Sequence, residues 1–129
     1  MKTVKIKVAD AVGPTLDWMV WNATGGAAAY PKTASGKTFL KLWRSNSAKY
    51  IHPSTDWSQG GPIIERECIA TYTMPGEVGG RWRAERWGSC HQRGPTPLIA
   101  AMRCYIARKL GYVVEVPEEL LGDAPKEAA

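Results

Sequence analysis

Apolar and charged residues alternate at the start of the chain, and this alternation predicts a strand over residues 2–8. Val4, Ile6 and Val8 lie on one side of an extended segment, and lysines lie between them on the other side. A period of two with β-branched residues is typical of a strand that buries one face.

The pattern then changes to the 3.6-residue period of a helix. Gly13-Pro14 begins the helix, since proline is tolerated in the first turn, and Gly25-Gly26 ends it. The apolar stripe along this helix consists of Leu16, Met19, Val20 and Ala23. Trp18 and Trp21 fall on the other side. We expect a covering loop or a contact between copies of the chain to bury them, in preference to a ligand platform.

Short apolar runs separated by turn formers predict the remaining elements. Strands are expected over residues 39–43, 68–74, 81–87 and 112–116. Residues 50–61 and 88–94 have the composition of loops, and residues 62–66 fit either a short helical turn or the start of a strand.

A second helix over residues 97–110 carries the strongest signals in the chain. Thr96 supplies the N-cap, Pro97 occupies the first helical position and Gly111 follows the last turn. One side of this helix is apolar and the other side consists of small residues, so we expect both sides to be covered. Arg103 lies between the two sides, where a half-buried arginine needs an anionic partner.

These elements predict an α+β domain, in which an antiparallel sheet of four or five strands carries two helices packed on one face. The chain of 129 residues suffices for one domain, expected over residues 1–121, with a frayed tail over residues 122–129. A hydrophobic fraction of 44% is ordinary for a globular protein. We expect no membrane partner, because no apolar stretch approaches the length of a membrane span or the core of a secretory signal.

The net charge of +5 is concentrated early in the chain, where residues 1–49 hold eight basic and two acidic side chains. The lysines are spread out, which favours solvated strand faces over a continuous anion-binding surface. Cys68, Cys90 and Cys104 are an odd number of cysteines without the spacing of zinc ligands. We therefore expect no disulfide framework, no metal site and no cofactor.

Two short motifs suggest enzymes, and each fails on its geometry. The run Ser35-Gly36-Lys37-Thr38 lacks the upstream glycine of a phosphate loop, since Pro31 stands there. His52, Ser54 and Asp56 are too far apart in an extended segment for a catalytic triad, and Asp56 fits a cap or an Asx turn better. We therefore name no catalytic residue and expect a protein that is not an enzyme.

Indole rings, guanidinium groups and turn residues form the combination that best fits ligand binding. Aromatic rings stack on a base, arginine binds phosphate, and hydroxyl or carboxylate groups contact a ribose or a base edge. The candidate ligand-binding residues are Ser54, Thr55, Asp56, Trp57, Arg66, Trp82, Trp87 and Arg103. The alternative is that tryptophans fill the core while arginine stems cover them. Six tryptophans against one phenylalanine are unusual for core filling alone.

Two segments have a distinctive sequence: residues 54–66, STDWSQGGPIIER, and residues 94–105, GPTPLIAAMRCY. Together with Leu16-Asp17-Trp18 and the closing VPEEL of residues 116–120, they resemble the NinX-like family of small proteins from tailed phages and prophages. The resemblance covers most of the chain. It implies a phage accessory protein made in the host bacterial cytoplasm, and it implies no activity, cofactor or catalytic residue.

We therefore expect a phage accessory protein that binds and sequesters a small phosphorylated ligand without catalysis. The expected ligand is a host nucleotide immune signal of the cyclic oligonucleotide or ADP-ribose type. Tight capture favours a homo-oligomer, with Trp18 and Trp21 as the contact. The alternatives are a protein that binds single-stranded nucleic acid and a protein–protein inhibitor of a host enzyme.

Overall fold

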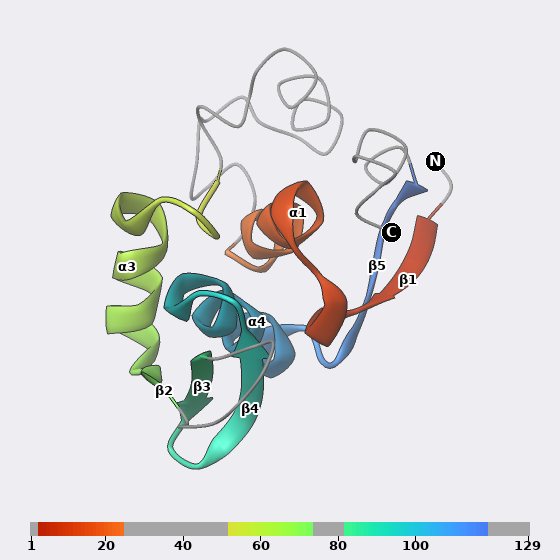
Figure 1. The fold of residues 1–129 in the computed structure, drawn as a ribbon. Coiled ribbons are helices and arrows are strands. Elements are labelled where there is room, and N and C mark those ends of the chain that lie inside the picture. The colour runs from red at the N-terminus through yellow and green to blue at the C-terminus, as the bar shows by residue number, and fades with distance from the viewer. Residues whose placement is uncertain (1–2, 25–51, 74–81, 119–129) are drawn as a thin grey trace.

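A computed structural model describes residues 3–24, 52–73 and 82–118 of the chain (Figure 1). The elements in these ranges are β1 (Thr3–Lys7), the 3-10 helix η1 (Val8–Asp10), α1 (Gly13–Ala23), α3 (Trp57–Glu67), β2 (Ala70–Thr73), β3 (Trp82–Arg86), β4 (Ser89–Gly94), α4 (Pro97–Lys109) and β5 (Val113–Pro117). The strand expected over residues 39–43 and the motif of residues 35–38 lie outside the described residues.

The described strands form two antiparallel sheets, and the α+β class is confirmed. β1 pairs with β5, and β2, β3 and β4 form a second sheet in that order. The five strands are thus divided between two sheets and are not joined in one sheet of four or five. Two sheets form because β1 pairs with β5, which lies far along the chain. The strands β2, β3 and β4 follow one another in the sequence and pair among themselves.

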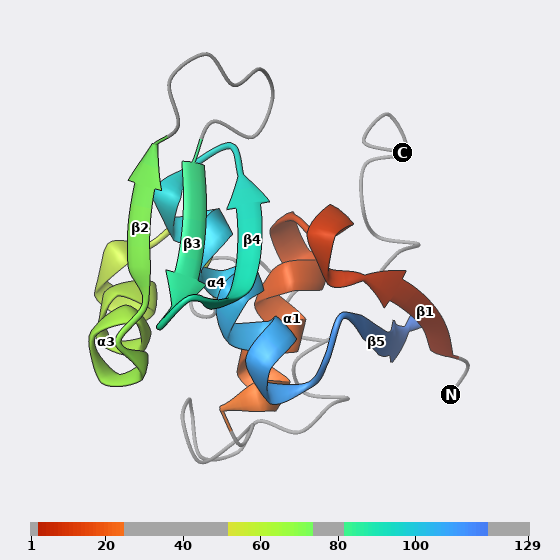
Figure 2. The same cartoon turned by 90° about the horizontal axis from the view of Figure 1, so that it is seen from below.

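Helix α4 occupies the centre of the fold and is buried on nearly every side. It packs on β2, β3 and β4 and also contacts α1 and α3. Figure 2 shows α3 and α4 on the same side of the three-stranded sheet, and no described helix covers the other side. Small side chains allow the close packing that was expected for this helix; the buried ones are Ala100, Ala101, Cys104 and Ala107.

Helix α3 occupies residues for which a loop and a short turn were expected. The Asp56 carboxylate accepts a hydrogen bond of 2.8 Å from the Ser58 N–H, so the expected capping role of Asp56 is confirmed. The expectation of a loop through residue 61 is wrong, because packing on α4 extends the helix from this cap. Gly60 lies so close to α4 that an added Cβ would be 2.5 Å from Leu98 Cδ1.

Strand β4 is a second correction, because residues 88–94 were expected to form a loop. The turn between β3 and β4 consists of Trp87 and Gly88, with φ angles of 51° and 77°. Two positive φ angles match the type I′ turn, whose twist suits a hairpin. Asparagine or glycine usually occupies the first of these positions, so the tryptophan concealed the hairpin in the sequence.

Candidate ligand-binding site

The side of the three-stranded sheet that faces away from α3 and α4 carries two arginines next to each other. The register pairs Arg83 of β3 with Arg93 of β4, and Ala84 beside them faces the core. Successive side chains of a strand point to opposite faces, so both arginines lie on the side away from α4. Directly opposite residues have Cβ atoms about 5 Å apart, and this spacing brings two positive charges together.

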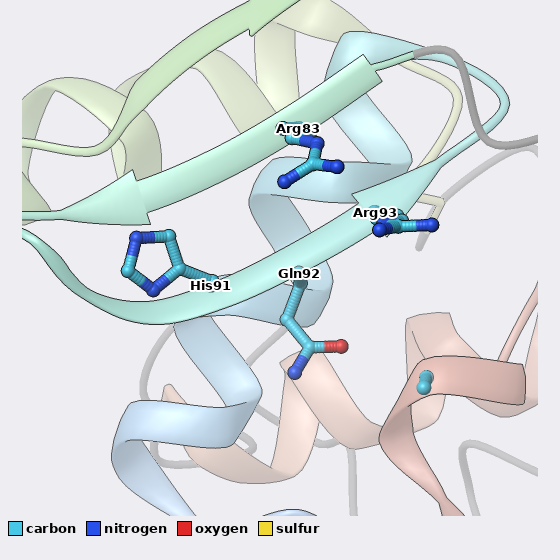
Figure 3. A pocket seen from close by; sticks show the side chains of 5 residues that line it. Arg83, His91, Gln92 and Arg93 are labelled. Carbon is cyan, nitrogen blue, oxygen red and sulfur yellow. The ribbon is translucent and has the colours of Figure 1, made fainter. Parts of the chain in front are cut away.

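A hollow of about 410 Å³ lies beside these arginines. Its lining residues are Ala9, Arg83, His91, Gln92 and Arg93. Figure 3 shows the two arginines and His91 along the strands, with Gln92 projecting from β4 toward the N-terminal segment. The hollow therefore combines guanidinium groups, an imidazole and an amide, which are all groups that bind phosphate or carboxylate oxygens.

Glu85 connects two neighbouring side chains on the same face of the sheet. Its Oε1 accepts a hydrogen bond of 2.8 Å from the Tyr72 hydroxyl and lies 3.3 Å from His91 Nε2. The Tyr72 hydrogen bond lowers the pKa of Glu85 below its usual range, and the same bond raises the pKa of Tyr72. Glu85 is therefore held as a carboxylate, which orients the His91 ring at the edge of the hollow.

Arg103, one of the expected ligand-binding residues, does not line this hollow and has only 7% of its surface exposed. Its Nε donates to the Ala11 carbonyl oxygen at 2.9 Å, and its Nη1 donates to the Arg93 carbonyl oxygen at 2.7 Å. Burial lowers the pKa of the guanidinium, and the charge of Asp10 opposes that shift. Arg103 thus joins the segment after η1 to β4 through backbone oxygens.

Three other expected residues line a second, smaller hollow of about 190 Å³. They are Ser54, Thr55 and Trp57, and they share it with Thr96, Leu98 and Ile99 at the start of α4. Trp57 is 55% exposed, so one part of its indole is open to solvent. Asp56 is engaged as the cap of α3 and is not among the lining residues.

The remaining expected residues line neither of these two hollows. Arg66 is exposed, with its Nε 3.2 Å from Glu67 Oε2 and its guanidinium 6.0 Å from the centre of the Tyr105 ring. Trp82 is half-buried against the core. Trp87 is 76% exposed at the hairpin turn. The structure thus separates these residues from the group around Trp57.

Trp18 and Trp21, expected at a contact between subunits, lie on α1 with ring centres 6.5 Å apart. Trp21 is buried within the single chain, and Trp18 packs against the core. Little indole surface of Trp21 is left for another subunit, and the subunit contact stays a prediction. The expected stripe on the same helix is confirmed, since Leu16, Met19 and Val20 are fully buried.

A buried carboxylate holds the loop that lines the smaller hollow. Asp17 of α1 is only 2% exposed, and its Oδ1 accepts a hydrogen bond of 2.9 Å from the Ser54 N–H. Burial raises the pKa of Asp17 from 3.8 to about 6, although the Ser54 hydrogen bond and the nearby His52 act in the opposite direction. Ionised Asp17 is therefore costly to bury near neutral pH.

Replacing Asp17 with asparagine is expected to remove part of the pH dependence of stability. Because the folded pKa is above the unfolded one, the contribution of Asp17 is full below pH 3.8 and is lost as the pH rises through about 6. Between pH 5 and pH 7 the parent should lose about 1 kcal/mol more unfolding free energy than Asp17→Asn. Urea unfolding at both pH values measures this difference, and equal losses in the two proteins would contradict it.

Neither a metal site nor a disulfide is found in the described part of the chain. No group of three or more His, Cys, Asp and Glu side chains in these ranges is placed to hold a metal ion. Cys68, Cys90 and Cys104 are free, and burial raises the pKa of the Cys104 thiol to about 12. None of the helices described is long and apolar enough to span a membrane.

The group of residues around the larger hollow was not predicted from the sequence. His91, Gln92 and Arg93 belong to a segment that was expected to be a loop, and Arg83 was not among the candidate ligand-binding residues. The sequence signal for these residues is the pair Trp87-Gly88. Interpreted as a hairpin turn, this pair predicts that the segments on either side of it are two paired strands. Such a turn sets the register that places Arg83 opposite Arg93.

Comparison with known proteins identifies the family. No curated protein matches the chain. The family model described as bacteriophage P22, NinX, matches residues 7–109, which include α1, α3, α4 and both hollows. Since this match spans most of the chain and agrees with the segments around Ser54 and Thr96, the protein belongs to the bacteriophage P22 NinX family.

Proposed function

We propose that this protein binds a small phosphorylated ligand of the nucleotide class without chemically changing it. The observation that supports this most directly is the 410 Å³ hollow lined by Arg83 and Arg93. Each guanidinium presents a planar set of donors that matches the oxygens of a phosphate group. His91 and Gln92 add donors at the same place, so a phosphate would have charge and several hydrogen bonds available.

Hydrogen bonds hold the Arg93 backbone, and a contact with Glu85 holds the His91 ring, before a ligand arrives. Arg103 fastens the Arg93 backbone to the segment after η1, and Glu85 orients His91. Groups that are already in position lose less conformational entropy on binding, which favours tight capture. For a phage protein, tight binding without chemistry withdraws the ligand from the host. We propose a host nucleotide immune signal in the bacterial cytoplasm as that ligand, with a homo-oligomer as the form that holds it.

A thermal-shift and calorimetry panel tests the proposal. Cyclic dinucleotides, ADP-ribose derivatives and nucleoside phosphates are titrated into the full chain, and at least one should raise the melting temperature. Arg93→Gln should weaken the binding of that compound by about 10- to 100-fold, since one charge-assisted contact contributes about 1.5–3 kcal/mol. Arg108→Gln is the matched control, because Arg108 is an exposed arginine at the end of α4.

The proposal fails if no phosphorylated compound stabilises the protein, or if Arg93→Gln and Arg108→Gln bind the active compound equally well. Since Arg93 is exposed, its side chain can be shortened without opening a cavity in the core.

Single-stranded nucleic acid is the second candidate ligand, and the exposed tryptophans favour it. Trp57 and Trp87 are both more than half exposed, and the Arg86 guanidinium lies 4.2 Å from the centre of the Trp87 ring. Exposed rings and cations of this kind stack on successive bases. A fluorescent oligothymidine included in the same panel distinguishes the two candidates. Binding of the oligomer alone, with affinity that falls steeply in salt, would favour nucleic acid.

A further inference from the structure

We infer that the Tyr72 side chain binds the planar ring of the ligand, a nucleobase or a related heterocycle, by stacking, while Arg83 and Arg93 bind its phosphate. This inference rests on the proposed function and adds the part of the ligand that a phosphate site does not specify. The three residues come from β2, β3 and β4, and they lie on the face of this sheet that is turned away from α3 and α4 (Figure 2).

Tyr72 and the two arginines form one row across the three strands. Tyr72 pairs with Arg83, and Arg83 pairs with Arg93. The preceding Thr71 pairs with Ala84, which is buried in the core, so Tyr72 points to the same side as the arginines. Adjacent strands are about 4.8 Å apart, so the row extends over about 10 Å from Tyr72 to Arg93. A nucleotide has a comparable length from its base to its phosphate.

A shared contact also connects Tyr72 with the larger hollow. Glu85 Oε1 accepts the hydrogen bond of the Tyr72 hydroxyl at 2.8 Å and lies 3.3 Å from Nε2 of His91, which lines this hollow. Arg83, which is directly opposite Tyr72, lines the hollow as well. Tyr72 is not itself a lining residue, so a ligand with its phosphate in the hollow extends past Arg83 to place its ring on Tyr72.

The Tyr72 ring is half-buried and is held at both of its ends. Its Cβ belongs to β2, and its hydroxyl is bound to Glu85 on the neighbouring strand. A side chain that is held in this way loses little conformational entropy when another ring stacks on it. Aromatic side chains on the surface of a sheet bind bases by stacking in several classes of nucleic-acid-binding domain.

The charges around the row favour one orientation of the ligand. Glu85 holds a carboxylate against the Tyr72 hydroxyl, whereas the guanidinium groups belong to Arg83 and Arg93. A carboxylate repels a phosphate but does not repel an uncharged ring, and it accepts hydrogen bonds from amino groups on a base. The ring is therefore favoured beside Tyr72 and the phosphate beside the arginines.

Tyr72→Val separates this inference from the proposed function, because valine removes the ring and suits a strand. The four nucleoside 5′-monophosphates and ribose 5-phosphate, which lacks the base, are titrated by calorimetry into the full-length parent, Tyr72→Val, Tyr72→Phe and Tyr112→Val. Tyr72→Val should weaken the tightest monophosphate by about 5- to 150-fold and leave ribose 5-phosphate unchanged. Tyr72→Phe keeps the ring and should retain most of the affinity. Tyr112→Val is the matched control, since Tyr112 is exposed and lines neither hollow.

Three results would overturn the ring site and leave the phosphate site standing. The first is a parent that binds ribose 5-phosphate as tightly as every monophosphate, because the base is then not recognised. The second is equal binding of the monophosphate by Tyr72→Val and Tyr112→Val. The third is a loss in Tyr72→Val that is as large for ribose 5-phosphate as for the monophosphate. If no compound of this set binds the parent, the inference and the proposed phosphate site fail together.

Discussion

Replacing Arg103 with leucine is expected to lower the unfolding free energy by about 3 kcal/mol, one of the two largest single losses that we predict. The Arg103 guanidinium donates hydrogen bonds to the carbonyl oxygens of Ala11 and Arg93. Only 7% of the Arg103 surface is exposed to solvent. Leucine has no donor, so both carbonyl oxygens lose a charge-assisted hydrogen bond inside the protein. An unsatisfied buried polar group costs about 1–3 kcal/mol, and here there are two.

Chemical denaturation of Arg103→Leu, Arg103→Lys and Arg108→Leu measures this effect. Lysine keeps the charge but lacks the guanidinium geometry that reaches two acceptors, so Arg103→Lys should lie between the parent and Arg103→Leu. Arg108→Leu on the exposed part of the same helix should remain within about 0.5 kcal/mol of the parent. Equal stabilities of Arg103→Leu and Arg108→Leu would show that the two carbonyl contacts contribute nothing.

Replacing Gly60 with alanine should cost a similar amount, about 3 kcal/mol. A Cβ at this position would lie 2.5 Å from both Leu98 Cδ1 and the Pro53 carbonyl oxygen. Leu98 could rotate, but the carbonyl belongs to the backbone of the loop that lines the smaller hollow. Alanine therefore has to push α3 away from α4 or displace this loop, and each movement disrupts packing that is close to crystalline density.

Gly61→Ala is the matched control because it changes the adjacent glycine of the same helix. A Cβ there meets only Trp57 Cε3, at 4.0 Å, which is an ordinary contact. Alanine is also the better helix former, although the following Pro62 limits the gain. We expect Gly61→Ala to match the parent or to exceed its stability by up to about 1 kcal/mol. If thermal unfolding gave the two variants the same midpoint, the close approach of α3 to α4 would be refuted.

The sequence predicted best the elements whose signals are local. Helix α4 carries its own N-cap at Thr96 and its own stop at Gly111, and it is found between them. Helix α3 also has a local cap at Asp56. Gly60, Gly61 and Pro62 follow this cap and disfavour a helix, so we attribute the continuation of the helix to its packing on Leu98. Local propensity is a weak guide where tertiary contacts decide.

The candidate site was predictable in part for the same reason. Ser54, Thr55 and Trp57 are neighbours in the sequence, so a ligand-contacting loop could be recognised, and the structure places them together. Arg83 and Arg93 become neighbours only through the register of the β3–β4 hairpin. The alternation of residues along each strand does not reveal which residues of the two strands lie opposite each other. Arg103 was expected to meet an anion, yet its bonds go to backbone carbonyls from two distant segments.

The pairing of β1 with β5 sets the order in which the molecule can be completed during synthesis. The register joins Lys7 to Val113, so β1 gains this partner only after the long segment between them has been synthesised. Closing so long a loop carries an entropic cost, which the contacts of the β1–β5 pair offset only once β5 is present. A nascent chain halted before residue 113 presents β1 with no partner, and an open strand edge is a site for pairing with other chains. The edge of β1 is thus protected only after β5 has also left the ribosome.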